Sequence, residues 1–461
     1  MRLLVKFTNF SNKKIYFLGI GGISMYAIAF LMKNNGATVL GYDKTKTEIT
    51  DFLTNNGISV FYEASVENSK GADVCVCTAA IGSENEEYNN VLKNGVPIIY
   101  RGEFLGEIIK HFNNSIGVSG THGKSTTSGI LSEIFLSETI KNPTILMGAV
   151  LPSINSAYKI GSTNDLIFEA CEYKDSFLSF KPEISVILNV SLDHTDYFPN
   201  IEKMKESFVK YASGSKKVIV NMDCSNALEC AQKSTAEIVT YSISNKNSKY
   251  FADNITVSNG KTFFDLYING TMIKRFELGV PGMHNLSNSL AAISASLESN
   301  ISLDAIEKGL KNFKGIKRRL EFLGKINGAY IYDDYAHHPD EIIATLDAAE
   351  TMGMKKIHCL FQPHTYTRLK DFFQSFAEIF NQRTSEKNIE VIFLPTYAAR
   401  EKNTLGYDTE KLSQAVKNSI FLNSLHNAAE FIKTNASKDE MYILMGAGDI
   451  TNVSKLLEFD N

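Results

Sequence analysis

A short glycine-rich loop, from Gly117 to Thr127, contains the residue types best suited to chemistry in this chain. It follows apolar residues around Ile116 and leads into an apolar run with helical spacing. Backbone N–H groups of such a loop can bind phosphate oxygens, while a lysine reaches the terminal phosphates and a hydroxyl binds Mg²⁺. A surface turn is the alternative, but a turn has no need of a Lys-Ser-Thr run before a helix. The predicted ATP-binding residues of the loop are Gly120, Thr121, His122, Gly123, Lys124, Ser125 and Thr126.

Carboxylates and a histidine follow two further predicted strands. Glu169 ends the apolar run 166–169, and Glu172 follows in the next loop. The segment 189–196 places Asp193, His194 and Asp196 after another apolar strand. Because parallel sheets place ligands at the carboxyl ends of their strands, these groups can meet the loop, although solvated charges and a structural histidine remain alternatives. A histidine beside carboxylates suits a second divalent ion better than zinc. The predicted metal ligands are Ser125, Glu169 and His194.

A second glycine-rich turn lies near the N-terminus, between a predicted strand at 15–18 and a helix at 25–32. With the next strand at 38–43 it forms a β-α-β unit close to a dinucleotide fingerprint, except that Ser24 replaces the third glycine. The pattern favours a diphosphate at the helix N-terminus and Asp43 on a ribose or base, with simple tight packing as the alternative. The segment 78–85 is a candidate for the facing wall. The predicted substrate-binding residues here are Gly19, Gly21, Gly22, Ser24, Asp43, Ala80, Ile81 and Asn85.

Two more segments offer groups for a nucleotide. His284 and Asn288 share one face of a predicted helix, with Asn285 beside them, and such side chains can bind an adenine edge. The alternative is a helix cap with solvated asparagines. The basic run from Lys317 to Arg319 can reach a γ-phosphate, or it can be an ordinary solvated group of charges.

The C-terminal third contains two strand ends that each carry histidine and charge. They are the segments 333–339 and 361–368. Adjacent strand ends of this kind form a binding crevice in an α/β sheet. Arg368 suits a carboxylate, because a guanidinium can make two parallel hydrogen bonds to it.

Length and composition limit the class of protein. A chain of 461 residues predicts about three domains, and 44% hydrophobic with 21% charged residues is typical of globular protein. A net charge of −4 argues against general nucleic-acid binding. Six cysteines without a C-x₂-C pair indicate reduced thiols. Without an 18-residue apolar run or a signal peptide, we expect no membrane span and a cytoplasmic location.

Alternating strand and helix patterns predict an α/β fold with three domains. We expect a Rossmann-like domain at 1–111 and a central P-loop ATPase domain at 112–316. The region 235–280 of the central domain reads as a β-hairpin insertion, because short apolar runs lie between Asn and Gly turns. A second Rossmann-like domain is expected at 317–461.

These segments in this order resemble the Mur ligase family over nearly the whole chain, nearest to the branch that attaches L-alanine to UDP-N-acetylmuramate. The segments that carry the resemblance are 19–25, 120–126, 169–172, 193–194, 284–288, 317–319, 333–338 and 446–449. The resemblance implies a UDP-sugar domain, a central ATPase and a C-terminal amino-acid domain. It also implies an ATP-dependent ligase of peptidoglycan precursor synthesis that works through an acyl phosphate, as a monomer or weak homodimer.

The same resemblance implies roles for single residues. Ser125 and Glu169 would hold one Mg²⁺ and His194 a second, while the phosphates would contact Lys124 and Arg319. The amino acid would lie against Tyr335, His337 and Arg368. The residues expected to act in catalysis are therefore Lys124, His194, Arg319, His337 and Arg368.

One departure and three alternatives remain open. Many members of this branch have an arginine where this chain has Thr365, which affects the expected carboxylate contacts. A ligase that attaches a peptide during wall recycling would share most of the same motifs. A folate polyglutamate ligase would share the phosphate loop but not the N-terminal unit. A nicotinamide-dependent oxidoreductase would use that unit but would leave Lys124 and Ser125 unexplained.

Overall fold

The computed structural model describes residues 10–460 except 79, 163, 196, 259, 260, 387 and 400. It contains three β-sheets with helices, which confirms the predicted α/β class. Contacts divide the chain into two compact units. The first holds Met1–Asn254, Phe264–Phe276 and Ser287–Phe313, and the second holds Ile255–Phe263, Glu277–Leu286 and Lys314–Asn461. The three domain boundaries expected from the sequence stay predictions.

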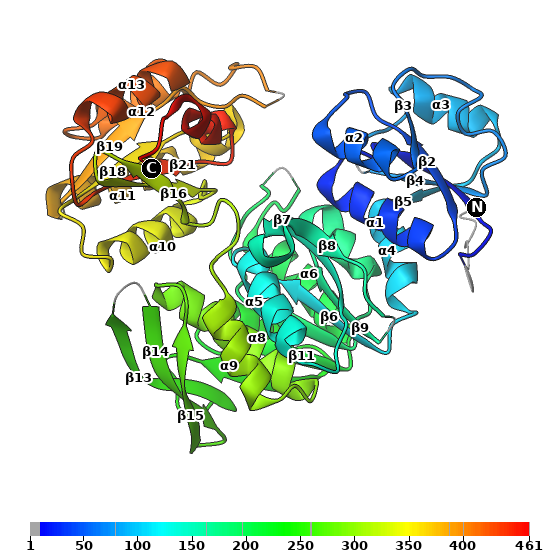
Figure 1. Cartoon of the computed structure of the whole chain (residues 1–461), viewed down its shortest axis with the longest axis horizontal. Coiled ribbons are helices and arrows are strands. Elements are labelled where there is room, and N and C mark those ends of the chain that lie inside the picture. The colour runs from blue at the N-terminus through cyan, green and yellow to red at the C-terminus, as the bar shows by residue number, and fades with distance from the viewer. Residues whose placement is uncertain are drawn as a thin grey trace. The chain divides into compact units, whose positions relative to one another are not determined.

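The N-terminal sheet has five parallel strands in the order β3-β2-β1-β4-β5 (Figure 1). Ile15 and Phe17 of β1 pack in one core with α1 and α4, whereas Tyr16 and Leu18 pack in a second core with α3. Helices therefore cover both faces, as a parallel sheet requires. The elements are β1 (Lys14–Leu18), α1 (Ile23–Asn34), β2 (Thr38–Tyr42), α2 (Glu48–Asn55), β3 (Ser59–Phe61), β4 (Val74–Cys77), α3 (Glu86–Lys93), β5 (Ile98–Tyr100) and α4 (Arg101–Ile109).

The central sheet has ten strands in the order β15-β14-β13-β12-β11-β10-β6-β9-β7-β8. From β12 to β7 in this sheet order, each strand pairs in parallel with the next one. Strand β8 pairs antiparallel with β7. The region expected to form a hairpin insertion supplies β13, β14 and β15, which extend this sheet at one edge. Its strands are β6 (Asn114–Ser119), β7 (Thr144–Leu151), β8 (Ser156–Lys159), β9 (Asp165–Glu169), β10 (Ile184–Ile187), β11 (Lys217–Asn221), β12 (Glu237–Ser242), β13 (Tyr250–Ser258), β14 (Lys261–Ile268) and β15 (Thr271–Leu278).

Helices follow several of the parallel strands, and two more helices follow one another after β15. They are α5 (Lys124–Ser137), α6 (Ile201–Ser213), α7 (Ser225–Gln232), α8 (Met283–Glu298) and α9 (Leu303–Asn312), with 3₁₀ helices η1 (Pro152–Ile154) and η2 (Tyr173–Ser179). Helix α4 packs on η2 through two glycines one turn apart. A Cβ on Gly102 would lie 3.1 Å from the Ser176 carbonyl oxygen, and one on Gly106 would lie 2.3 Å from that of Ser179. These two glycines therefore allow the backbone of α4, which follows the N-terminal sheet, to lie directly against the backbone of η2, which follows a strand of the central sheet.

We expect Gly106→Ala to lower the melting temperature, because the new Cβ would meet backbone that cannot move freely. Overpacking of this kind costs about 1–3 kcal/mol. Gly82→Ala is the matched control, since its Cβ would meet only the flexible carboxylate of Glu84. Thermal unfolding of both variants checks this, and equal melting temperatures would show that the α4–η2 contact is not close-packed.

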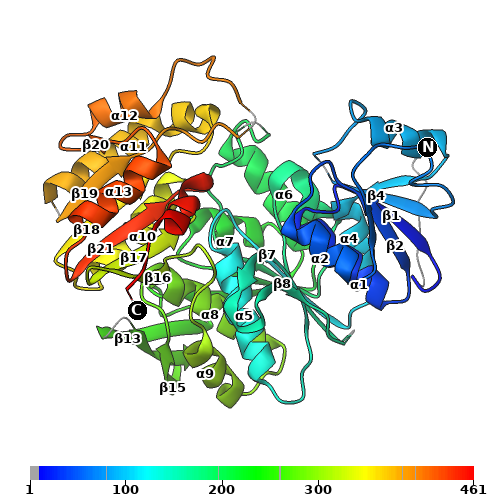
Figure 2. The ribbon, with the colours of Figure 1, turned by 45° about the horizontal axis from the view of Figure 1, so that its top comes forward.

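The C-terminal sheet has six strands in the order β16-β17-β21-β18-β19-β20. Among the described residues of this sheet, β16 and β17 pair antiparallel and the other neighbouring strands pair in parallel. One apolar core joins the sheet to α10, α11 and α12, and another joins it to α13 and η3. Figure 2 draws the sheet and helices α10 to α13 in yellow to red. The elements are β16 (Glu321–Ile326), β17 (Ala329–Asp334), α10 (Pro339–Glu350), β18 (Lys356–Phe361), α11 (Tyr366–Glu386), β19 (Ile389–Phe393), α12 (Thr409–Ala415), β20 (Ile420–Phe421), α13 (Leu425–Asn435), β21 (Glu440–Met445) and η3 (Asp449–Leu456).

No helix in the described part of the chain is long and apolar enough to cross a membrane.

Candidate functional site

The predicted phosphate loop joins β6 to α5 and leaves the start of the helix open. Gly120 has φ 138° and Gly123 has φ 86°, both in the region that favours glycine. Gly123 is the N-cap of α5, so no side chain caps the first N–H groups of the helix. A Cβ on Gly123 would lie 2.6 Å from Oδ1 of Asn288, which places that predicted adenine-binding residue beside the loop. The loop thus offers uncapped N–H groups of the kind that bind phosphate.

Lys124 lies at the centre of a buried ion pair. Its Nζ donates to both carboxylate oxygens of Glu172, at 2.9 and 3.1 Å, and to the Gly120 carbonyl oxygen at 2.6 Å. The Glu172 side chain is fully buried. Burial alone would lower the pKa of Lys124, but Glu172, with Cys171 and Glu169, outweighs this effect and raises the pKa. The ammonium group is therefore charged, and it is held at the phosphate loop.

Ser125 and Glu169 also meet, as the sequence predicts for ligands of one metal ion. The hydroxyl of Ser125 donates to Oε2 of Glu169 at 3.1 Å. Oε1 of Glu169 accepts from the backbone N–H of Gly148 at 2.8 Å. These contacts aim the carboxylate of the β9 strand end at the first turn of α5.

His194 lies beside Glu172. Its Nε2 is 3.6 Å from Oε1 of Glu172, and its ring centroid is 4.7 Å from that of Tyr173. The backbone of His194 has φ 52°, an uncommon value for a residue other than glycine. Burial would raise the pKa of Glu172, but Lys124 and His194 together lower it. The predicted metal ligands do not include Glu172, although it follows Glu169 by only three residues in the sequence. Asp196 lies outside the described residues.

Asn189 is a second residue that the site prediction left out. Its Oδ1 accepts from the His122 N–H at 2.8 Å, and its Nδ2 donates to the His122 carbonyl oxygen at 3.0 Å. Thr121 is fixed nearby, because its hydroxyl donates to the Ser191 carbonyl oxygen at 3.0 Å. The segment after β10 therefore holds the phosphate loop in shape. Asn189 is the first residue of the segment 189–196, and this position after a predicted strand is the feature of the sequence that could have identified it.

The donor set at this position fits a hard divalent cation. It combines a hydroxyl, two carboxylates and an imidazole, from Ser125, Glu169, Glu172 and His194. Oxygen ligands with one imidazole suit Mg²⁺ or Mn²⁺ better than a soft metal. Which of these groups bind an ion, and how many ions bind, stays a prediction.

The N-terminal glycine turn leads into α1, where the predicted diphosphate site would lie. Gly19 has φ 79°, and a Cβ there would lie 2.7 Å from Cγ2 of Thr78. Gly22 is the N-cap of α1, with no side-chain cap, and Ser24 lies in the first turn of that helix. Asp43 follows β2, and its Oδ2 accepts from the Gly21 N–H at 2.9 Å. Asp43 therefore shapes the turn in addition to its predicted contact with a substrate.

The facing segment has a partly structural role. Asn85 caps α3, because its Oδ1 accepts from the Tyr88 N–H at 3.1 Å. Ala80 and Ile81 lie in the turn after β4, and Ile81 donates its N–H to the Thr78 carbonyl oxygen at 3.2 Å. A Cβ on Gly19 would also lie 3.3 Å from the Ile81 side chain, so this segment borders the glycine turn.

In the second unit, Glu341 contacts two of the predicted site residues, Arg319 and His337. Arg319 binds its Oε1 at 3.1 Å, and the His337 N–H donates to its Oε2 at 3.1 Å. The Tyr335 ring lies 5.5 Å from the Arg319 guanidinium. Arg318, in contrast, donates to the Gly446 carbonyl oxygen at 2.6 Å. Both arginines therefore have partners within the protein, and the phosphate contact of Arg319 stays a prediction.

His337 also lies near the second predicted strand end. Its ring centroid is 5.9 Å from that of His364, which follows β18. Burial, followed by the charges of His337 and Arg368, lowers the pKa of His364 to about 4. The backbone N–H of Arg368 donates to the Thr365 hydroxyl at 3.4 Å in the first turn of α11. The structure thus brings His337, His364 and Arg368 into one region, as the two strand ends predict.

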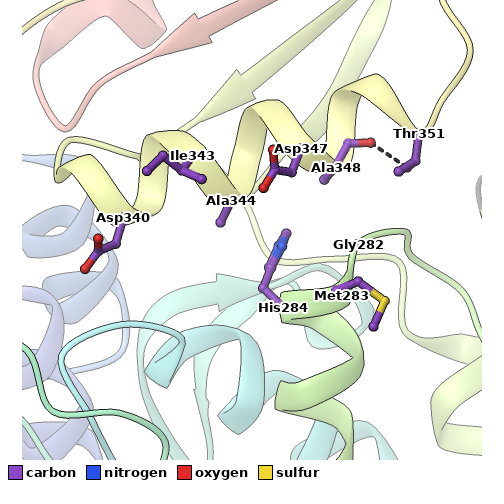
Figure 3. A pocket seen from close by; sticks show the side chains of 9 residues that line it. All are labelled: Gly282, Met283, His284, Asp340, Ile343, Ala344, Asp347, Ala348 and Thr351. Carbon is purple, nitrogen blue, oxygen red and sulfur yellow. Dashed lines mark hydrogen bonds between the residues drawn. The ribbon is translucent and has the colours of Figure 1, made fainter. Parts of the chain in front are cut away.

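His284 borders a cavity of about 350 Å³ next to α10, and Figure 3 shows its ring directed toward that helix. The cavity is lined by Asp340, Ala344 and Asp347 among others. Burial, followed by the charge of Arg319, lowers the pKa of His284 to about 4, so the ring is neutral. A neutral imidazole can donate at one nitrogen and accept at the other, as contact with an adenine edge requires. Asn285 donates to the Pro281 carbonyl oxygen at 2.6 Å.

Three family models match the chain in series. Residues 14–113 match the Mur ligase family, catalytic domain; residues 118–296 match the Mur ligase middle domain; and residues 318–448 match the Mur ligase, glutamate ligase domain. The matches follow the order expected from the motifs.

Curated relatives match over nearly the whole length. The UDP-N-acetylmuramate–L-alanine ligase of Clostridium beijerinckii is 38% identical over 452 residues, covering 96% of this chain and 97% of that protein. The enzyme of the same name from Caldicellulosiruptor bescii is 40% identical over 445 residues, covering 95% and 96%.

Solved structures agree. The UDP-N-acetylmuramate-alanine ligase of Thermotoga maritima has a TM-score of 0.78 and 25% identity, covering 96% of this chain and 97% of that one. A murein peptide ligase from Psychrobacter arcticus, at 21% identity and a TM-score of 0.68, shares the fold over 97% and 98%. With catalytic, middle and glutamate ligase domains in order and relatives near 40% identity across the whole chain, this protein belongs to the Mur ligase family.

Proposed function

We propose that the protein joins L-alanine to the carboxylate of UDP-N-acetylmuramate, with ATP converted to ADP and phosphate, in peptidoglycan precursor synthesis. The observation that carries the proposal is the match, over nearly the full length, to UDP-N-acetylmuramate–L-alanine ligases. The phosphate loop, the carboxylates at the strand ends and His194 also lie together in this chain. The proposal also includes a cytoplasmic enzyme that is a monomer or weak homodimer.

The reaction proceeds in two displacement steps. A carboxylate is a poor electrophile, so a carboxylate oxygen of the sugar nucleotide attacks the γ-phosphorus of ATP, and ADP leaves. The amine of L-alanine then attacks the acyl carbon of the acyl phosphate, an amide bond forms, and phosphate leaves while the amine loses its proton.

Lys124 is suited to the first step. Its charged Nζ lies at the start of α5, where the uncapped N–H groups also bind phosphate. When ATP binds, we propose that the ammonium group moves from Glu172 to the β- and γ-phosphate oxygens, and that Arg319 supplies further positive charge. Positioning and neutralisation of charge are the main contributions of a protein to phosphoryl transfer.

Two Mg²⁺ ions belong to the proposal. Ser125 and Glu169 would hold one, and His194, with Glu172 after it releases Lys124, would hold the other. Mg²⁺ bound there would neutralise charge on the phosphates. The hard oxygen donors of these side chains support this assignment.

One assay tests the proposed function. We expect phosphate release from ATP when the protein, Mg²⁺, UDP-N-acetylmuramate and L-alanine are combined, and little release when either acceptor is omitted. Replacing L-alanine by other amino acids, and then by the L-alanyl-γ-D-glutamyl-diaminopimelate tripeptide, separates this function from that of a peptide-attaching ligase. Activity with the tripeptide but not with L-alanine would overturn the proposal.

We expect Arg368→Ala to raise the KM for L-alanine about ten- to a hundredfold and to leave the KM for ATP nearly unchanged. The reason is that a charge-assisted hydrogen bond to a carboxylate in a desolvated site contributes about 1.5–3 kcal/mol. Thr365 cannot supply a second positive charge. Steady-state kinetics with each substrate varied in turn, together with a melting curve, checks the prediction. An unchanged KM with a lower melting temperature would make Arg368 a structural residue.

A further inference from the structure

A cavity of about 430 Å³ lies in the first unit, where helix α4 meets η2. Arg101, the first residue of α4, lines it, and so do Cys171 and the residues from Tyr173 to Ser176. Neither the sequence motifs nor the proposed mechanism uses this cavity. It nevertheless borders the phosphate loop, because Glu172, the residue after Cys171, holds Lys124.

Arg101 is the unusual group in this cavity. Within the described part of the chain, its guanidinium makes no hydrogen bond or ion pair, and burial lowers its pKa. Of the other charged groups that line the cavity, Asp175 accepts from the Tyr197 hydroxyl at 2.8 Å, and Lys174 lies 5.4 Å from the Tyr173 ring. Glu103 also lines it and is itself not without a partner. A partly buried guanidinium without an anion is costly, which points to an anionic ligand.

The position of Arg101 in the sheet indicates which anion. In the order β3-β2-β1-β4-β5, the carboxyl ends of four neighbouring strands carry Asp43, the Gly19–Gly22 turn, the Ala80–Ile81 segment and Arg101. Neighbouring strands are about 4.8 Å apart, so β2 and β5 are separated by roughly 14 Å. This length is on the scale of a nucleotide diphosphate sugar.

A sugar nucleotide along this edge has a defined direction. With its base or ribose at Asp43 and its diphosphate at the glycine turn, the sugar reaches β4. Its acidic substituent then reaches β5 and the cavity of Arg101. Cys171 lines the same cavity as Arg101, and the next residue, Glu172, holds Lys124 at the phosphate loop. The carboxylate would therefore be held next to the place where the γ-phosphate is transferred.

We propose that Arg101 binds the carboxylate of the sugar-nucleotide substrate and selects the acid over a neutral sugar nucleotide. The inference rests on the function proposed above and adds a specificity-determining residue to it. A guanidinium can make two parallel hydrogen bonds to a carboxylate, whereas a neutral sugar would leave the buried charge without a partner. Rejection of the neutral analogue follows from that penalty.

The test compares two ligands and three proteins by titration calorimetry of the full chain with Mg²⁺ and a non-hydrolysable ATP analogue. The ligands are UDP-N-acetylmuramate, which has the carboxylate, and UDP-N-acetylglucosamine, which lacks it. The proteins are the wild type, Arg101→Gln, and Lys110→Gln as a control. Lys110 follows the same helix, is exposed and pairs with Glu107, so its removal takes away an equal charge outside the cavity.

We expect Arg101→Gln to weaken binding of UDP-N-acetylmuramate about ten- to a hundredfold while its affinity for UDP-N-acetylglucosamine stays within about twofold of wild type. Lys110→Gln should change neither affinity, and Arg101→Lys should restore part of the loss. Equal weakening of both ligands would place Arg101 at the diphosphate and overturn the inference. Unchanged affinities with a lower melting temperature would make Arg101 structural and also overturn it. Failure of the wild type to bind either ligand would instead refute the proposed function itself.

Discussion

Lys124→Ala should lower the rate of phosphate release at least a hundredfold. Removing one preorganised positive or donor group from a phosphoryl-transfer or oxyanion site costs on the order of 10²–10³ in kcat. The Nζ of Lys124 is the charged group fixed at the N-terminus of α5, so no neighbouring side chain of the loop can replace it. Steady-state phosphate release with saturating substrates measures the effect. Near-normal turnover in a folded variant would remove the phosphate-loop assignment.

The same substitution should also lower stability, and this must be separated from the loss of activity. Without Lys124, the fully buried Glu172 loses its main partner, and breaking a buried ion pair costs on the order of 3 kcal/mol. The double variant Lys124→Ala/Glu172→Gln removes the unpaired charge. We expect it to recover much of the melting temperature but none of the activity. Recovery of both would mean that Lys124 acts only through the fold.

Glu169→Gln should raise the Mg²⁺ concentration needed for half-maximal activity about ten- to a hundredfold. The Gly148 N–H holds the carboxylate of Glu169 against the Ser125 hydroxyl. A glutamine side chain has the same shape as glutamate but lacks the negative charge that attracts a cation. Even residues that only support metal ligands change affinity by about 10–100-fold, so a direct ligand should do at least as much. Measuring initial rate against Mg²⁺ concentration checks the prediction.

Glu202→Gln is the control for this experiment. Glu202 lies in the first turn of α6, with its side chain 67% exposed, and its removal changes the net charge by the same amount. We expect its Mg²⁺ dependence to match that of wild type. If Glu169→Gln also matched wild type at full turnover, the metal would have to be held by other groups, with Glu172 and His194 the next to examine.

Several parts of the fold could be predicted from the sequence because their signals are local. The predicted strands at 15–18 and 166–169 lie within β1 (Lys14–Leu18) and β9 (Asp165–Glu169), since short apolar runs bounded by polar turns leave little choice. The strands β7 and β8 were not predicted, because their residues lack a clear alternating pattern and are fixed by pairing with β9 and with each other. The edge strand β16 is likewise fixed by antiparallel pairing with β17.

The sequence by itself determined the phosphate loop, because glycine, lysine and serine at that spacing act through their own backbone and the next helix. It also placed Glu169 and His194 at strand ends, where a parallel sheet gathers ligands. Only the tertiary structure decided that Lys124 pairs with Glu172, that Asn189 holds the loop, and that Arg101 shares a cavity with Cys171. Each of these relations joins residues distant in the chain. Pairing of buried charges and amides depends on how strands and helices pack, and local spacing carries no information about that packing.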